Sequence, residues 1–451
     1  MIDIAASFQK FCSEIHLHSD EFMVSLKEIT KKLNKKYYET NSEANHLLLV
    51  GSIGRGTAVE GVSDIDVIFE LPQEVYKRFN AYESNGQSAL LQEVKNVIAE
   101  RFPKTEIKGD GQVVDVFFDA YTVELVPVFR QSNNSFKYPD SNDGGSWKIT
   151  DPIPEQEACK NQDKVTGGTF VNIANILRTW KNNRGFYLGG LLVDTLAFNF
   201  FDEHDDIKAV GFGEYYDLCK QIFLYISKQD PHKSYWLAPG SNQQVYNCED
   251  GAFIGRAKRA FSKLDNAKDD EREDALISLF GHKFSTSIVQ KNFSISNSRG
   301  LDYYSAPNEQ FIEDKFPVDI SGRVKIDCQV TQNGFRPFWL SSILPRKINK
   351  WLSKNKQLYF RVVGTDIKEP FDVYWKVRNI GNDAKQRRME RGQIYKDDGR
   401  RERHEHTDFN GSHYVECYIV KNGICVARSR IQVPINVGYI DKEHLLLNGQ
   451  E

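Results

Sequence analysis

The feature that most constrains the fold is a glycine-rich turn followed by two acids on one strand, within residues 51–69. The turn holds Gly51 and Ser52, and Asp64 and Asp66 follow in an otherwise apolar run. Because side chains alternate faces along a strand, the two acids point the same way while Ile65 points to a core. The segment predicts an acidic strand face beside a tight turn.

Two carboxylates on one strand face offer the oxygen ligands that Mg²⁺ prefers in proteins. A pair of ions held in this way can clamp the attacking and leaving oxygens of an in-line displacement at phosphorus. Glycines let the backbone turn closely enough for amides and the Ser52 hydroxyl to approach a triphosphate. We therefore expect Gly51 and Ser52 to hold phosphate, and Asp64 and Asp66 to hold metal.

A third carboxylate is expected on a neighbouring strand, because two ions need a shared ligand set. Residues 113–118 and 122–129 are typical of a hairpin, with Asp115 in the first arm and Glu124 in the second. We favour Glu124, since it interrupts an apolar run, where an acid is costly without a cation. Asp115 stays open as the alternative, as does an edge strand on which Glu124 faces water.

With these residues in view, the chain resembles the polymerase-beta-like nucleotidyltransferases, and in particular the CD-NTases, bacterial relatives of cyclic GMP-AMP synthase. The resemblance extends to residues 173–181, Ile-Ala-Asn-Ile-Leu-Arg-Thr-Trp-Lys, and to residues 189–197, Gly-Gly-Leu-Leu-Val-Asp-Thr-Leu-Ala. The first segment is similar to the helix that these enzymes place behind the triphosphate. Arg178 stands where many relatives have Lys.

The resemblance implies an enzyme that uses Mg²⁺, with Mn²⁺ as an alternative, to join nucleoside triphosphates into a cyclic di- or oligonucleotide. Asp64, Asp66 and Glu124 would hold the ions and carry catalysis. Arg178 and Lys181 would bind the nucleotide's phosphates beside the turn. The implied setting is bacterial anti-phage (CBASS) signalling, in which the product activates a downstream effector.

The last hundred residues resemble a sensor domain, AGS-C, that is appended to some nucleotide cyclases and CD-NTases. The segments that carry this resemblance are residues 371–381 and 413–427. It implies a nucleotide or phage-derived ligand at the C-terminal domain. The expected fold is α/β (α+β): a palm with an N-terminal spine helix over 1–155, a helical lobe over 156–320 and a β-rich domain over 321–451.

Composition narrows the class of protein. The chain has 451 residues and a net charge of −3, which argues against stable binding of a DNA or RNA polymer. No stretch approaches the eighteen or more apolar residues of a membrane span, and the start lacks the basic region of a signal peptide. We expect a cytoplasmic protein without membrane contact, whose seven scattered cysteines are reduced thiols.

Two other functions use the same residues. One is nucleotidyl transfer to an RNA, protein or small-molecule acceptor through the same three acids. The other is a nucleotide-sensing module whose palm is autoinhibited until the C-terminal domain is engaged. Base identity would depend on the acceptor pocket, for which Tyr138, Trp147 and Tyr187 are the stacking candidates.

The remaining pattern predicts helices within 4–42, over 88–102 and over 163–182, and a loop over 133–154. Beyond residue 320, alternating segments predict strands, with Asn422-Gly423 as a hairpin turn. Residues 382–411 are expected to leave this sheet as an excursion. Its basic part, 385–403, is either an anion site or a salt-bridged loop, and His404, His406 and His413 are expected to be a surface cluster without metal.

Overall fold

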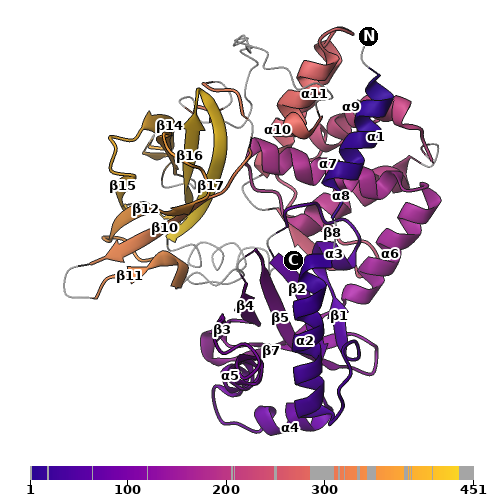
Figure 1. The fold of residues 1–451 in the computed structure, drawn as a ribbon, viewed down its shortest axis with the longest axis vertical. Coiled ribbons are helices and arrows are strands. Elements are labelled where there is room, and N and C mark those ends of the chain that lie inside the picture. Colours follow the sequence, from indigo (N-terminus) through magenta and orange to yellow (C-terminus); the bar gives the residue numbers. More distant parts are fainter. Residues whose placement is uncertain are drawn as a thin grey trace, which may run out of the picture. The chain divides into compact units, whose positions relative to one another are not determined.

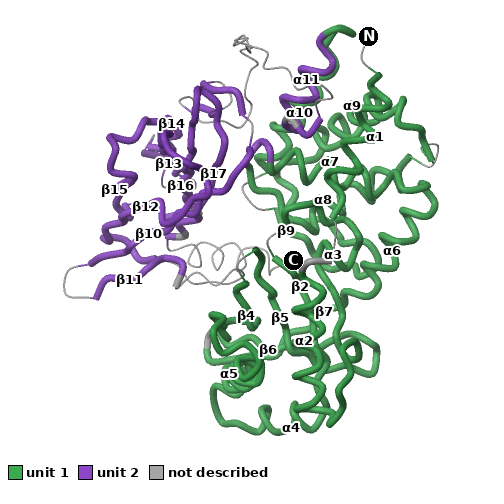
Figure 2. The backbone as a smooth tube through the Cα atoms, viewed as in Figure 1, with its two compact units in different colours: residues 1–182, 186–270 green, residues 183–185, 271–451 purple. Residues whose placement is uncertain are grey.

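The structure is a computed structural model of the whole chain. It describes residues 3–17, 20–62, 64–118, 120–204, 207, 209–247, 251–284, 309–312, 315–318, 320–332, 336–342, 352–379, 384, 386–387, 389–408 and 410–435. The chain divides into two compact units, one of residues 1–182 and 186–270 and the other of residues 183–185 and 271–451 (Figure 2). The domain borders expected near residues 155 and 320 stay predictions.

The first unit is built on a mixed sheet with the strand order β1-β2-β5-β4-β3, to which β6 and β7 are added beyond β5. The central pair β2 and β5 is parallel, and the other pairs are antiparallel. The strands are β1 (Leu47–Leu49), β2 (Asp64–Glu70), β3 (Glu106–Asp110), β4 (Val113–Phe117), β5 (Thr122–Arg130), β6 (Phe136–Asp140) and β7 (Ser146–Thr150).

Helices α2 (Asp20–Tyr37) and α5 (Gly86–Ala99) cover one face of this sheet. Apolar residues recur along α2 at helical spacing, and they pack on the strand residues that point to the same side. The α2 residues in this core are Phe22, Leu26, Ile29 and Leu33, and the strand residues include Ile65, Val67, Val123 and Leu125. Because side chains alternate along a strand, the acids next to these core residues in β2 and β5 point to the opposite face of the sheet.

Most other helices of this unit lie together at one end of the sheet, opposite the end where α4 lies (Figure 1). They are α1 (Ile4–Ile15), α6 (Pro152–Val165), α7 (Thr169–Arg184), α8 (Gly190–Glu203), α9 (Tyr215–Ser227) and α10 (Ala252–Asn266), while α4 (Gln73–Asn80) lies beside α5. The single helix predicted over 163–182 is wrong at its start. Gly167 and Gly168 have φ of +57° and +91°, so the backbone turns between α6 and α7.

The loop predicted over 133–154 is also wrong. Residues 136–140 and 146–150 form the antiparallel pair β6 and β7, and β6 continues the sheet from β5. Phe136 is buried beside Ile68 and Val128, and this packing outweighs the turn-forming composition of the segment.

The second unit contains two sheets that share a core. Their strand orders are β11-β10-β12-β15 and β14-β13-β16-β17. The core joins Leu358 and Phe360 of the first sheet to Trp375, Val415 and other residues of the second. The strands are β10 (Val324–Thr331), β11 (Phe338–Trp339), β12 (Gln357–Thr365), β13 (Asp372–Arg378), β14 (Arg391–Lys396), β15 (Glu402–His406), β16 (Gly411–Lys421) and β17 (Ile424–Ile435), and helix α11 (Arg272–Phe280) also belongs to this unit.

The hairpin predicted at Asn422-Gly423 is confirmed. Both residues have positive φ, 52° and 75°, and Lys421 pairs with Ile424 across the turn. The excursion expected over 382–411 is wrong in part, because β14 and β15 form edge strands of the two different sheets. No helix among the described residues is long and apolar enough to cross a membrane.

Within the second unit, a buried ion cluster joins Glu309 to strands β13 and β16. Lys376 is 1% exposed, and its Nζ lies 2.8 Å from Glu309 Oε1 and 3.4 Å from Glu416 Oε2. Arg378 Nε lies 3.3 Å from the other oxygen of Glu309. The ammonium of Lys376 is therefore stable in the interior through its carboxylate partners.

We predict that Glu309→Ala destabilises the second unit by about 3 kcal/mol, because it removes the nearer partner of a buried ammonium group. Thermal unfolding, with hydrogen exchange of β13 and β16, measures the effect. Glu369→Ala is the matched control, since Glu369 pairs with Arg401 at an exposed position and its loss should cost less than about 1 kcal/mol. Equal stability of the two variants would contradict the prediction.

Candidate active site

Strand pairing brings the predicted acids into one row. Asp66 of β2 is the register partner of Glu124 on the parallel neighbour β5, and Glu124 is in turn opposite Asp115 on β4. Register partners share a face of the sheet, and Asp64 lies two residues before Asp66 on the same face. Glu124 is 6% exposed, whereas Asp64 and Asp66 are partly exposed. Asp115 thus joins the row beside Glu124 rather than replacing it.

The row is not a closed ligand set. Among the residues that the structure describes, no group of three His, Cys, Asp or Glu side chains is arranged so that it could hold a metal ion. The donor chemistry nevertheless fits a hard divalent cation, since carboxylate oxygens arranged on one face are the ligands that such ions take.

The glycine-rich turn packs directly against the acids. It forms the short helix α3 (Gly51–Gly54), which begins after Val50, and the Val50 amide donates to the Asp66 carbonyl at 2.9 Å. Gly51 has φ of +62°, and a Cβ atom at this position would lie 2.0 Å from Asp66 Oδ2. Glycine is therefore required at residue 51 both by its backbone angle and by the closeness of Asp66.

A buried ion network holds the residues that follow the turn. Asp194 of α8 is 0% exposed and accepts hydrogen bonds from Arg55 Nε at 2.8 Å and from Thr57 Oγ1 at 3.0 Å. Arg55 also lies 3.4 Å from Glu155 of α6, whose other oxygen accepts from Ser241 at 2.9 Å. The network connects Arg55, just after the turn, to residues 100 and 139 positions further along the chain.

Arg178, predicted to bind nucleotide, belongs to this network. Its Nη2 donates to both oxygens of Asp194 at 2.6 Å, to Thr57 Oγ1 at 3.0 Å and to the Gly190 carbonyl at 3.0 Å. Burial lowers the pKa of Arg178, and the Asp194 carboxylate opposes that shift. These contacts favour a positioning role for Arg178.

Lys181 lies one turn further along α7 and is partly buried. Burial, together with the positive charge of Arg178, lowers the pKa of Lys181 to about 8, and Asp194 offsets part of this effect. A second anion beside Lys181 would raise that pKa again, since an opposite charge favours the protonated form. Lys181 therefore holds its proton less tightly than an exposed lysine does.

The sequence analysis missed Arg55, Glu155 and Asp194. A signal was present for Asp194, which interrupts the apolar run Leu-Leu-Val-Asp-Thr-Leu-Ala. Of the stacking candidates, Trp147 packs on Tyr76 with ring centroids 5.0 Å apart, on the face away from the acids. Tyr138 lies on the acidic side of the sheet, near Phe136, and Tyr187 is 46% exposed.

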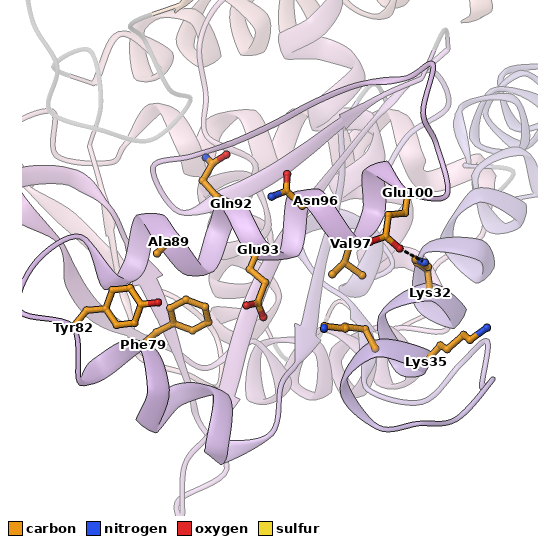
Figure 3. A pocket seen from close by; sticks show the side chains of 11 residues that line it. Lys32, Lys35, Phe79, Tyr82, Ala89, Gln92, Glu93, Asn96, Val97 and Glu100 are labelled. Carbon is orange, nitrogen blue, oxygen red and sulfur yellow. Dashed lines mark hydrogen bonds and ion pairs between the residues drawn. The ribbon is translucent and has the colours of Figure 1, made fainter.

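A surface cavity of about 690 Å³ lies among α2, α4 and α5 (Figure 3). Lysines of α2 line one side, where Lys32 pairs with Glu100, and Phe79 and Tyr82 line another. The helices that form it cover the apolar face of the sheet. The cavity is therefore separate from the row of acids.

Two family models match the chain. Residues 2–163 match the Second Messenger Oligonucleotide or Dinucleotide Synthetase domain, and residues 306–436 match the Adenylyl/Guanylyl and SMODS C-terminal sensor domain. The chain is a CD-NTase with a C-terminal AGS-C domain. The family and the mixed fold with a β-rich C-terminal region, both predicted from sequence, are confirmed.

The CD-NTase has distant relatives among curated proteins and solved structures. A probable cyclic nucleotide synthase of Bacillus cereus (strain VD146) is 21% identical over 164 residues, which cover 34% of this chain and 49% of that protein. The chain thus spans about half the length of this curated relative.

Among solved structures, Escherichia coli MS115-1 CdnC in complex with HORMA-deltaN is 16% identical with a TM-score of 0.48, covering 62% of this chain and 98% of that one. Bradyrhizobium diazoefficiens CdnG in complex with GTP is 9% identical with a TM-score of 0.46, covering 63% and 96%.

We predict that Gly51→Ala destabilises this CD-NTase by about 1 to 3 kcal/mol more than Gly56→Ala, because the added methyl group overlaps Asp66. Gly56 is a matched control, since its φ is also positive, +72°, while nothing lies within 4 Å of its Cβ position. Denaturant unfolding measures the difference. Equal losses would show that backbone strain, and not contact with Asp66, is the constraint.

A second prediction concerns pH. Below about pH 8, Lys181 is protonated in both the folded and the unfolded state, so its contribution to stability is constant. Between about 8 and the ordinary value of 10.5, the unfolded state binds more protons, so this contribution rises with pH. Lys181→Met should remove the rise and stabilise the protein at pH 7, as measured by thermal unfolding across this range. Lys164→Met, at an exposed position of α6, should keep the wild-type pH dependence.

Proposed function

We propose that this CD-NTase is a metal-dependent enzyme that joins nucleoside triphosphates into a cyclic di- or oligonucleotide and releases pyrophosphate. The observation that carries the proposal is the row formed by Asp66, Glu124 and Asp115, with Gly51 packed against Asp66. Phosphoryl transfer depends on positioning and on neutralising charge, and both are properties of such a row beside a phosphate-binding turn.

Asp64, Asp66 and Glu124 would hold Mg²⁺, or Mn²⁺, on the open face of the sheet. When bound, these ions would lower the pKa of the attacking hydroxyl and offset the charge of the leaving pyrophosphate. The buried Glu124 lies between Asp66 and Asp115 in the row, which favours it as the ligand that completes the set.

The turn and helix α7 would receive the triphosphate. Gly51 packs against the Asp66 side chain, and the backbone amides of the turn and the Ser52 hydroxyl would hold phosphate oxygens beside the metal. Lys181 would neutralise phosphate and gain a proton as it does so, because its pKa of about 8 rises beside an anion. Arg178 would act through Asp194 by holding the turn in place.

The family suggests the setting of this chemistry. We infer a cytoplasmic signalling enzyme of an anti-phage (CBASS) system, whose product activates a downstream effector. The C-terminal AGS-C domain would bind a nucleotide or phage-derived signal. The net charge of −3 supports small nucleotides rather than a nucleic-acid polymer as substrate.

We predict that the purified protein converts labelled nucleoside triphosphates into a small product that resists phosphatase, with Mg²⁺ or Mn²⁺ and without primer. Asp66→Asn should lower the rate at least a thousandfold, because it removes a ligand charge from the centre of the site. Glu124→Gln should lose more activity than Asp115→Asn if Glu124 is the third ligand. Glu70→Gln is the control, since Glu70 lies at the end of β2 in a surface pair with Arg130.

Two outcomes would overturn the proposal. Label that appears on added RNA, protein or a small acceptor, with no phosphatase-resistant product, would indicate an acceptor-specific transferase. Full activity of Asp66→Asn would show that the row does not carry the chemistry.

A further inference from the structure

The side-chain amide of Gln156 on α6 lies against both ends of the glycine-rich turn. It is partly buried, and its Nε2 donates to the Leu49 carbonyl at 2.8 Å. Leu49 ends β1, one residue before Val50, after which α3 begins. At the other end of the turn, a Cβ atom on Gly54 would lie 2.6 Å from the same Nε2. One amide group is therefore packed between the beginning and the end of the turn.

The Leu49 carbonyl lies on the outer edge of the sheet. Within the described residues, β1 is the end strand of its sheet and pairs with β2. The Val50 amide donates to the Asp66 carbonyl across this ladder. Because bonded and non-bonded positions alternate in an antiparallel pair, the backbone groups of Leu49 point away from β2. Gln156 thus supplies the hydrogen bond that β2 cannot give to this carbonyl.

Gly54 has no room for a side chain at this contact. An added Cβ atom would lie 2.4 Å from the Leu49 carbonyl oxygen, in addition to its overlap with Gln156. The Gly54 amide donates to the Val50 carbonyl at 3.0 Å and so closes the single turn of α3. Close packing of this kind transmits a displacement instead of absorbing it. A shift of Gln156 would therefore move the turn with it.

Helix α6 also holds the residue that follows the turn. Glu155, next to Gln156, lies 3.4 Å from Arg55. The start of the helix is itself held by Gly240, where an added Cβ atom would lie 2.1 Å from the Pro154 carbonyl oxygen. Two adjacent side chains of one helix therefore fix the turn at its beginning, at its end and at Arg55.

The turn needs support from outside itself. It consists of the four residues Gly51–Gly54, and a helix of this length is not stable through its own hydrogen bonds. Gly51 packs against the Asp66 side chain, so the position of the turn sets where a phosphate would lie relative to the acids. A displacement of about 1 Å near reacting groups can lower a rate about a hundredfold.

We propose that Gln156 is a positioning residue for the triphosphate. Its hydrogen bond to Leu49 and its contact with Gly54 hold the turn where its amides meet phosphate beside Asp66. This role rests on the proposed function, because binding of phosphate by the turn is part of that function. Gln156 acts through the turn, so its loss should weaken triphosphate binding more than it destabilises the fold.

Binding of the α,β-methylene analogues of the four nucleoside triphosphates, with Mg²⁺, to the full-length protein tests the proposal by calorimetry. Gln156→Met keeps the length of the side chain and removes the donor, and it should weaken binding about tenfold. Asn161→Leu removes an exposed amide from the same helix and should leave binding unchanged. Gln156→His keeps an N–H donor and should recover most of the affinity.

Hydrogen exchange of the nucleotide-free protein gives a second readout. Gln156→Met should raise exchange in residues 50–55 and leave β5 as in the wild type, whereas a general loss of stability would raise exchange in both. If Gln156→Met does not fold, Gln156→Glu takes its place, since it keeps the shape of the amide and loses the donor.

The two proposals fail in different ways. Wild-type triphosphate affinity, or wild-type exchange in the turn, in the folded variant that lacks the donor would overturn the role of Gln156. Failure of the wild-type protein to bind any of the four analogues would instead overturn the proposed function.

Discussion

The position of the turn beside the acidic face depends on the carboxylate of Asp194, which is fully buried. A buried charge persists when partners surround it, and here they are Arg55 and Thr57 beyond the turn and Arg178 on α7. The turn that approaches Asp66 is therefore fixed from two sides, by β2 and by the helices. Loss of Asp194 would leave two guanidinium groups in the interior without their shared counter-ion.

Local pattern was sufficient to predict part of this site. Alternation along β2 placed Asp64 and Asp66 on one face, because that property requires no knowledge of the partner strand. The parallel register that sets Asp66 beside Glu124 depends on two strands more than fifty residues apart. It could not be predicted from the local sequence. The partner of Arg178 could not be predicted either. Its charge suggested phosphate binding, whereas in the structure it donates hydrogen bonds to Asp194.

The C-terminal unit shows the same division between local and distant information. The turn at Asn422-Gly423 was predictable since its backbone angles demand those residues. Strands β14 and β15 were not, because their charged residues resemble a loop. Edge strands carry such charges to discourage pairing with other chains, and here Arg391 of β14 pairs with Glu405 of β15 on the other sheet.

The distribution of the Asp194 network along the chain has a consequence for biosynthesis. The segment matched to the synthetase family ends at residue 163, whereas Arg178 and Asp194 come later. A fragment cut at that border keeps Arg55 and Glu155 and lacks the central anion. During synthesis on the ribosome, more than 140 residues after Gly51 must be made before Asp194 can bind Arg55 and hold the turn in place.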